Sequence, residues 1–190
     1  MVSATIGRRA QAPDTVWFGA PLSGVMSVCN TSARREEADV AGLYFEQFDV
    51  GQRFEHLVRR TVTETDNLLF SALTMNPAAI HLDAEYSRGT AFGQRLVNSV
   101  FTLGLLVGLS VYDTTYGTTV GNLGWEEVRF PRPVLIGDTL RAATTVLSKR
   151  ESRSHPEGGI VVFEHRAWNQ RDEEVACGRR AALMLKRPAA

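Results

Sequence analysis

Cysteine is scarce in this chain: Cys29 and Cys177 are the only two among 190 residues. A small secreted protein held together by disulfides has more cysteines, and a structural zinc site has its cysteines and histidines clustered. The four histidines are scattered, without the paired spacing of zinc ligands. The sequence therefore argues against a disulfide scaffold and against a metalloenzyme. Two free thiols are typical of a reducing compartment, so we expect a cytoplasmic protein.

A surplus of charge of either sign is also missing. Lys plus Arg and Asp plus Glu each number 21, so the formal net charge is zero. Proteins that bind nucleic acid usually carry a basic surplus, because contacts with phosphate supply much of their affinity. The most apolar stretch, residues 96–111, is interrupted by polar side chains and is shorter than the roughly 20 residues of a membrane span. We expect neither a nucleic-acid nor a membrane partner.

The length and composition indicate one globular domain. With 190 residues, 44% of them hydrophobic, the chain can bury one core but not two. Residues 1–40 mix Gly, Ala, Ser, Pro and Arg without periodicity, and we interpret them as a flexible or partner-packing arm. Residues 41–190 form the predicted single domain.

The first half of this domain shows helix signals. β-branched and aromatic residues predict a strand over residues 53–63, and Thr63 with an acid three residues later predicts a helix start. That helix ends at Asn76-Pro77, because the residue before a proline resists the α conformation. A loop follows, and then a helix over residues 98–112.

The long helix carries apolar residues almost all around, which is typical of a helix buried on most sides. Gly104 and Gly108 lie one turn apart and leave a strip without side chains, on which we expect a sheet to approach closely. Four strand-like segments follow, and we expect them to pair in antiparallel succession: residues 120–130, 139–152, 159–169 and 175–186. A buried helix wrapped by an antiparallel sheet is an α+β fold.

Two segments place polar groups where chemistry could occur. The first, NPAAIHLD, carries Asn76 and His81 in the loop that leads to the long helix. The second carries Asn98 and Ser99 at the start of that helix, where backbone N–H groups lack partners inside the helix. Such N–H groups can stabilise a developing oxyanion. The simpler interpretations are a surface or capping histidine and an ordinary helix cap.

A third segment, RFPRPVLIGDTL over residues 129–140, links two of the predicted strands. Pro131 and Pro133 cannot donate to a strand ladder, so they end the pairing. Arg129 and Arg132 could bind phosphates or carboxylates.

These segments resemble the MaoC-like dehydratase family, the (R)-specific enoyl-CoA hydratases of the hotdog fold. Residues 129–140 resemble the family signature R-F-x-x-P-V-x-x-G-D-T-L, and the NPAAIHLD segment resembles its catalytic D-x-N-P-x-H-x-D loop. The resemblance covers roughly residues 42–187. Within the family, the sequence looks closest to the branch that acts on mesaconyl-CoA, itaconyl-CoA or β-methylmalyl-CoA.

The resemblance implies roles for four residues. The family histidine, a general base, falls on His81. The family aspartate falls on Asn76, and because an amide has no usable basicity this residue is expected to hold a water molecule instead. The family's His-Gly pair at the helix start falls on Asn98 and Ser99. The Ser99 N–H remains available as an oxyanion donor, and Asn98 is grouped with the substrate-binding residues.

The resemblance implies a hydro-lyase that adds or removes water across the C2–C3 double bond of a short enoyl-CoA thioester. If the acyl group carries an extra carboxylate, Arg88 or Arg95 is expected to bind it, because both lie between His81 and the long helix; otherwise they are exposed or bind CoA phosphates. Arg132 is a further substrate-binding residue.

Three alternatives remain open: a medium-chain (R)-specific enoyl-CoA hydratase, a hotdog thioesterase and a non-catalytic acyl-CoA-binding homologue. The reaction needs no metal or organic cofactor, because coenzyme A enters as part of the substrate. Hotdog folds usually pair, so the resemblance also implies a homodimer or a higher homo-oligomer.

Overall fold

The computed structural model describes residues 42–188. The predicted N-terminal arm, residues 1–40, lies outside the described residues. The elements follow one another in this order: η2 Phe45–Gln47, β1 Arg53–Glu55, β2 Arg60–Thr61, α1 Glu64–Leu73, α2 Ala79–Leu82, α3 Ala84–Arg88, α4 Ser99–Thr114, β3 Thr119–Arg129, β4 Thr139–Glu151, β5 Gly158–Trp168 and β6 Glu174–Leu185.

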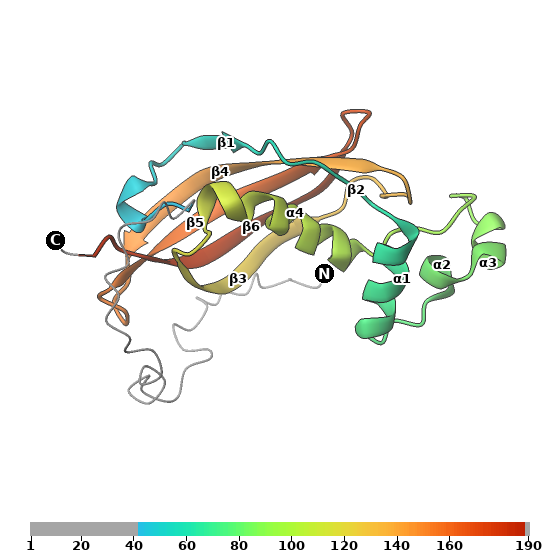
Figure 1. Cartoon of the computed structure of the whole chain (residues 1–190), viewed down its shortest axis with the longest axis horizontal. Coiled ribbons are helices and arrows are strands. Elements are labelled where there is room, and N and C mark those ends of the chain that lie inside the picture. The colour runs from blue at the N-terminus through green and yellow to red at the C-terminus, as the bar shows by residue number, and fades with distance from the viewer. Residues whose placement is uncertain (1–41, 189–190) are drawn as a thin grey trace, which may run out of the picture. The chain divides into compact units, whose positions relative to one another are not determined.

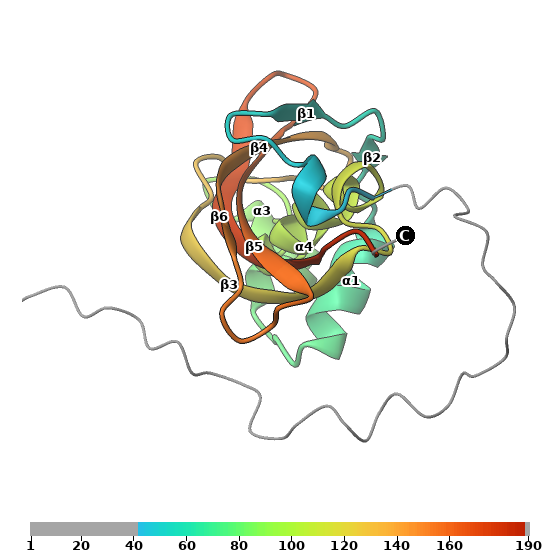
Figure 2. The same ribbon diagram turned by 90° about the vertical axis from the view of Figure 1, so that its left-hand side faces the viewer.

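An antiparallel sheet curves around α4, as Figures 1 and 2 show from two sides. Its strands lie in the order β1-β4-β5-β6-β3, and β2 pairs with β4. This arrangement confirms the predicted α+β class. The expected succession of strands is wrong for β3, which pairs with β6 and not with β4. Pro131 and Pro133 follow β3 and cannot donate to a ladder, so the chain is free to cross to the other side of the sheet before β4 begins.

The predicted first strand is broken into β1 and β2. β1 ends at the pair Glu55–Ala143, whereas β2 begins at the pair Arg60–Leu140. Residues 56–59 therefore lie opposite only two residues of β4, 141 and 142, and this longer segment bulges out of the sheet. Leu57, inside the bulge, is 94% exposed.

The segment between the two major helices is also richer in structure than predicted. The start of α1 is as expected, because Thr63 and Asp66 form a reciprocal capping box. The following segment, predicted as a loop, contains the short helices α2 and α3. The Asp83 carboxylate accepts from the N–H groups of Glu85 and Tyr86, which supplies the start signal for α3.

Helix α4 packs one face on the sheet, with Leu106 fully buried. The opposite face is open in this chain, where Val100 is 59% and Tyr112 is 64% exposed. A Cβ atom on Gly104 or Gly108 would meet nothing within 4 Å, so the expected close approach of a sheet is not made by the described residues. None of the helices in this part of the chain combines the length and the apolarity that crossing a bilayer requires.

A chain of polar groups runs into the core, and its His56, Thr144 and His165 side chains are buried. One ring nitrogen of His56 lies 2.8 Å from the Asp113 carboxylate and the other lies 2.8 Å from the Thr144 hydroxyl. That hydroxyl lies 2.9 Å from Nδ1 of His165. An ionised carboxylate only accepts, so with His56 neutral the Thr144 hydroxyl donates to His56 and His165 Nδ1–H donates to Thr144. The Nε2 atom of His165 has no partner among the described residues.

Acid should destabilise the fold through His165. Burial, with the positive charge of Arg180, holds the pKa of His165 well below its usual 6.5. Below pH 6.5 the unfolded chain therefore binds a proton that the folded chain does not. The unfolding free energy should fall with decreasing pH, by up to about 1.4 kcal/mol per unit.

Chemical denaturation between pH 7 and pH 5 measures this slope, and the substitution His165→Gln is expected to flatten it. Carboxylates such as Glu164, whose pKa lies below the usual 4.5, stabilise the fold above that value and lose their contribution only at lower pH. An equal slope in the wild type and the variant would contradict the assignment to His165.

Candidate active site

His81 lies in α2 and presents one free ring nitrogen. Its Nδ1 atom is 3.0 Å from the Leu96 carbonyl oxygen. A carbonyl only accepts, so Nδ1 carries the proton of the neutral ring and Nε2 keeps its lone pair. The backbone of His81 is held as well, because its N–H donates to the Ala78 carbonyl over 3.0 Å. The site therefore holds a histidine in the tautomer that can accept a proton at Nε2.

The first turn of α4 presents a backbone donor. Asn98 is the N-cap, and its side-chain oxygen accepts from the Val100 N–H over 3.0 Å. Ser99 is the first residue of the helix, and within residues 42–188 no acceptor for its N–H is recorded. The free N–H groups at a helix start carry the positive end of the helix dipole. Ser99 N–H is thus placed to bind an oxygen that bears negative charge.

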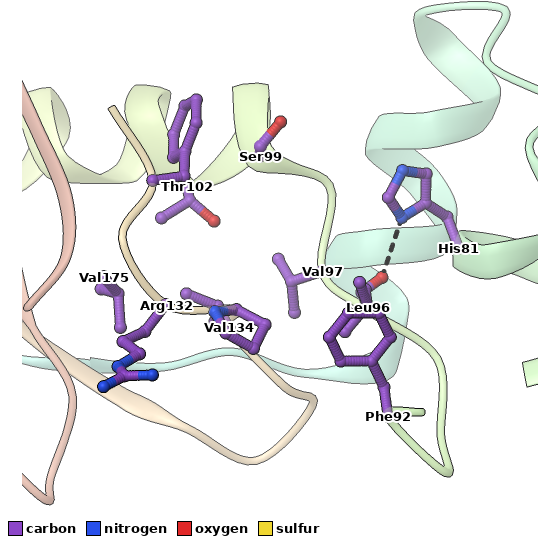
Figure 3. Close-up of a pocket in the computed structure, with 11 residues that line it drawn as sticks. His81, Phe92, Leu96, Val97, Ser99, Thr102, Arg132, Val134 and Val175 are labelled. Atoms are coloured by element: carbon purple, nitrogen blue, oxygen red, sulfur yellow. Dashed lines mark hydrogen bonds between the residues drawn. The ribbon is translucent and has the colours of Figure 1, made fainter. Parts of the chain in front are cut away.

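His81 and Ser99 line one cavity of about 310 Å³. Figure 3 shows that His81 reaches it from one side and Ser99 from the first turn of α4. Thr102 lines it one turn further along α4, and Phe92 and Arg132 come from the segments before α4 and after β3. In this view Arg132 lies at the opposite end of the group from His81. No group of three or more His, Cys, Asp or Glu side chains in the described chain is arranged to hold a metal ion.

Asn67, on α1, ties the two halves of the site together. Its side chain is fully buried. Its amide nitrogen donates to the carbonyl oxygens of His81 and Leu96, over 2.9 and 3.1 Å. Its amide oxygen accepts from the Asn98 N–H over 2.8 Å. One side chain therefore bonds to the segment that carries His81 and to the residue before Ser99.

Two of the predicted site residues use their side-chain oxygens for local backbone N–H groups. The side-chain oxygen of Asn76 accepts from the Ala78 N–H over 3.1 Å, and Asn76 is not among the residues that line the cavity. Asn98 is 3% exposed and likewise does not line it. Neither observation tests a role in catalysis, so both roles stay predictions.

Arg88 and Arg95 do not reach the cavity of His81. They line a separate hollow of about 210 Å³ together with Glu64. Arg95 forms an ion pair with Glu64, and Arg88 forms one with Glu85 on the same short helix. Both arginines are thus paired with carboxylates outside the cavity of His81, and the expected contact with a substrate carboxylate stays a prediction.

The sequence interpretation missed Asn67, Thr102 and Phe92. Asn67 left a faint signal, because asparagine is a poor helix former in the interior of a helix and its amide needs partners when buried. Thr102 and Phe92 belong to apolar or mixed stretches that any buried helix or loop could contain, so only the folded structure shows that they line the cavity.

Comparison with known proteins places this site in a family. The model of the MaoC like domain matches residues 46–166, which contain His81 and Ser99. The match covers more than half of the chain, and the chain therefore belongs to the MaoC-like family, as its motifs predicted.

Among curated relatives, the mesaconyl-CoA hydratase of Cereibacter sphaeroides is 33% identical over 150 residues, which are 79% of this chain and 43% of the relative. The chain thus spans less than half the length of this relative. A solved MaoC-like dehydratase from Rhodospirillum rubrum is 30% identical with a TM-score of 0.68, covering 78% of this chain and 100% of that chain.

A Mycobacterium tuberculosis protein described as a double hotdog fold matches with a TM-score of 0.72 and 22% identity. The match covers 80% of this chain and 47% of that chain, and at this identity it shows the fold alone. The hotdog fold expected from the motifs is confirmed.

Proposed function

We propose that the protein is a hydro-lyase that adds water to, or removes it from, the C2–C3 double bond of a short enoyl-CoA thioester. One observation carries the proposal: His81, whose Nδ1 is held by the Leu96 carbonyl, and Ser99, the first residue of α4, line the same cavity. Membership of the MaoC-like family supports it, as does the similarity to a mesaconyl-CoA hydratase.

The chemistry needs a base and a site for an oxyanion. Nε2 of His81 takes a proton from water, and the water oxygen bonds to C3. The π electrons move toward the thioester oxygen, which becomes an enolate oxygen bound by the Ser99 N–H. As the enolate collapses, the proton on His81 passes to C2, which completes the addition and regenerates the neutral ring.

We also propose that Asn76 helps to hold the attacking water. Its side-chain oxygen accepts from the Ala78 N–H, and its amide nitrogen, which has no acceptor among the described residues, can donate to the water. The contribution would be one of positioning, because an amide cannot take the proton. The acyl-CoA itself supplies coenzyme A, and the proposal requires no resident cofactor.

The substrate class follows from the arginine at the cavity. Arg132 lines the cavity that holds His81 and Ser99, whereas Arg88 and Arg95 line another hollow. We therefore propose that Arg132 binds the second carboxylate of a mesaconyl-type or itaconyl-type acyl group, through two parallel hydrogen bonds.

We propose a second copy of the chain as the partner. The open face of α4 presents Val100, Gly104, Gly108 and Tyr112 at four-residue spacing, which places them on one side of the helix. Strand β3 is an edge of the sheet, and its Val120 and Leu123 are about half exposed. Exposed apolar surface beside an unpaired edge is typical of a protein–protein interface.

Removing the base should abolish most of the activity. His81→Ala is expected to lower kcat for hydration by roughly 10²- to 10⁴-fold, the usual contribution of general acid–base catalysis. The loss of the enoyl-thioester absorbance measures the rate, and the thermal midpoint shows whether the variant is folded. A folded variant with a near-normal rate would remove His81 from the mechanism.

Ser99 allows a test of its backbone N–H. Proline is tolerated at the first helical position, and the preceding Asn98 has ψ 127°, which suits a residue before proline. Ser99→Pro deletes the N–H, so kcat should fall by roughly 10²- to 10³-fold, as for one lost oxyanion donor. Ser99→Ala keeps the N–H and should retain most of the rate. Equal loss in both variants would assign the effect to the side chain.

The carboxylate proposal is tested by comparing three esters. Values of kcat/KM for mesaconyl-CoA or itaconyl-CoA should exceed the value for crotonyl-CoA, and Arg132→Ala should reduce this preference by roughly 10- to 100-fold, the worth of a charge-assisted pair. Arg88→Ala, outside the cavity, serves as the control and should leave the preference unchanged.

Two outcomes would favour the alternatives. If the wild type turns over crotonyl-CoA or longer enoyl esters best, an (R)-specific enoyl-CoA hydratase replaces the carboxylated substrate. Hydrolysis of the thioester without hydration would indicate a thioesterase, and binding without turnover a non-catalytic acyl-CoA-binding protein.

A further inference from the structure

We propose that Asn67 is a positioning residue that fixes His81 relative to the first turn of α4. The inference rests on the proposed function, because it assigns Asn67 a role through the base and the oxyanion donor. Asn67 is fully buried and is not among the residues that line the cavity. Any effect of its side chain on the reaction must therefore pass through the groups that it bonds.

The chemistry of the amide suits this role. An asparagine side chain has two N–H donors and an acceptor in one planar group. Both donors are used, toward the His81 and Leu96 carbonyls, and the oxygen accepts from the Asn98 N–H. A carboxylate of the same shape has no donor, and a serine has only one. The three contacts thus require an amide at this point.

The Leu96 carbonyl transmits the restraint to the imidazole ring. It accepts both from Nδ1 of His81 over 3.0 Å and from the Asn67 amide over 3.1 Å. The Asn67 donor holds this carbonyl in place, and the carbonyl in turn sets the tautomer and the orientation of the ring. Without that donor, the Leu96 carbonyl is less firmly held, although its neighbouring N–H groups still bond to Ile80 and Val134.

Anchoring of α1 alone does not account for the contacts. Helix α1 also packs on α4 through Phe70 and Phe101, whose ring centroids lie 5.6 Å apart in an edge-to-face arrangement. Such aromatic pairs hold helices together without a buried amide. Burial of an amide is costly unless it is hydrogen-bonded, and here every side-chain bond of Asn67 ends at a backbone group of His81, Leu96 or Asn98.

The substitution Asn67→Asp tests the role at constant shape. It keeps an oxygen for the Asn98 N–H but removes the donors to His81 and Leu96. We expect kcat to fall by roughly 10²-fold, as for a misplaced catalytic group, with KM for the acyl-CoA changed by less than about threefold. Ser71→Ala is the matched control. Ser71 is also fully buried on α1, its hydroxyl has no partner among the described residues, and it does not line the cavity.

A double-mutant cycle separates positioning from a general loss of structure. If Asn67 acts through His81, then Asn67→Asp should not lower kcat further in a protein that already carries His81→Ala. If Asn67→Asp lowered kcat by the same factor in both backgrounds, or left kcat unchanged on its own, the positioning role would be overturned. A fully active His81→Ala protein would instead overturn the proposed function, so the two failures are distinguishable.

A measurement on the unmodified protein covers the case in which Asn67→Asp does not fold. The side-chain amide protons of Asn67 should exchange with water far more slowly than those of Gln94, which is exposed in the segment before α4. Nitrogen-resolved NMR exchange measurements report both. Equally fast exchange would show that the Asn67 amide does not hold the two carbonyls, and would overturn the proposal.

Discussion

The site depends on how the first backbone N–H groups of α4 find partners. A helix start leaves several N–H groups without acceptors inside the helix, and buried ones must be satisfied elsewhere. The Asn67 side chain accepts from the Asn98 N–H, and the Asn98 side chain accepts from the Val100 N–H. Ser99 lies between them and lines the cavity, and its N–H has no acceptor among the described residues. Two asparagines thus leave one donor free for a ligand.

The sheet and the segment before α4 hold the first turn of α4 in place. The sheet curves around α4 and buries one face of the helix (Figure 2), which fixes its axis. The segment before α4 is held to the segment between β3 and β4, because the Val97 N–H donates to the Val134 carbonyl. The same segment supplies the Leu96 carbonyl that orients His81. His81, Ser99 and Arg132 are therefore held around one cavity by elements that are far apart in the sequence.

The sequence was most informative where a local signal decides the structure. The capping box at Thr63, the long apolar helix and the three last strands have such signals. The motifs pointed to His81 and Ser99, which the structure brings to one cavity. Long-range features were not predictable in this way. The pairing of β3 with β6, the bulge that exposes Leu57 and the ion pair between Arg95 and Glu64 depend on which segments meet after folding.

The most direct test of the central claim is a crystal structure of the protein with an unreactive analogue of an enoyl-CoA or 3-hydroxyacyl-CoA ester. We expect the thioester oxygen at hydrogen-bond distance, about 2.9 Å, from the Ser99 nitrogen, with C3 of the acyl group facing Nε2 of His81. An acyl group seated in the hollow of Arg88 and Arg95, away from both groups, would contradict the proposed site.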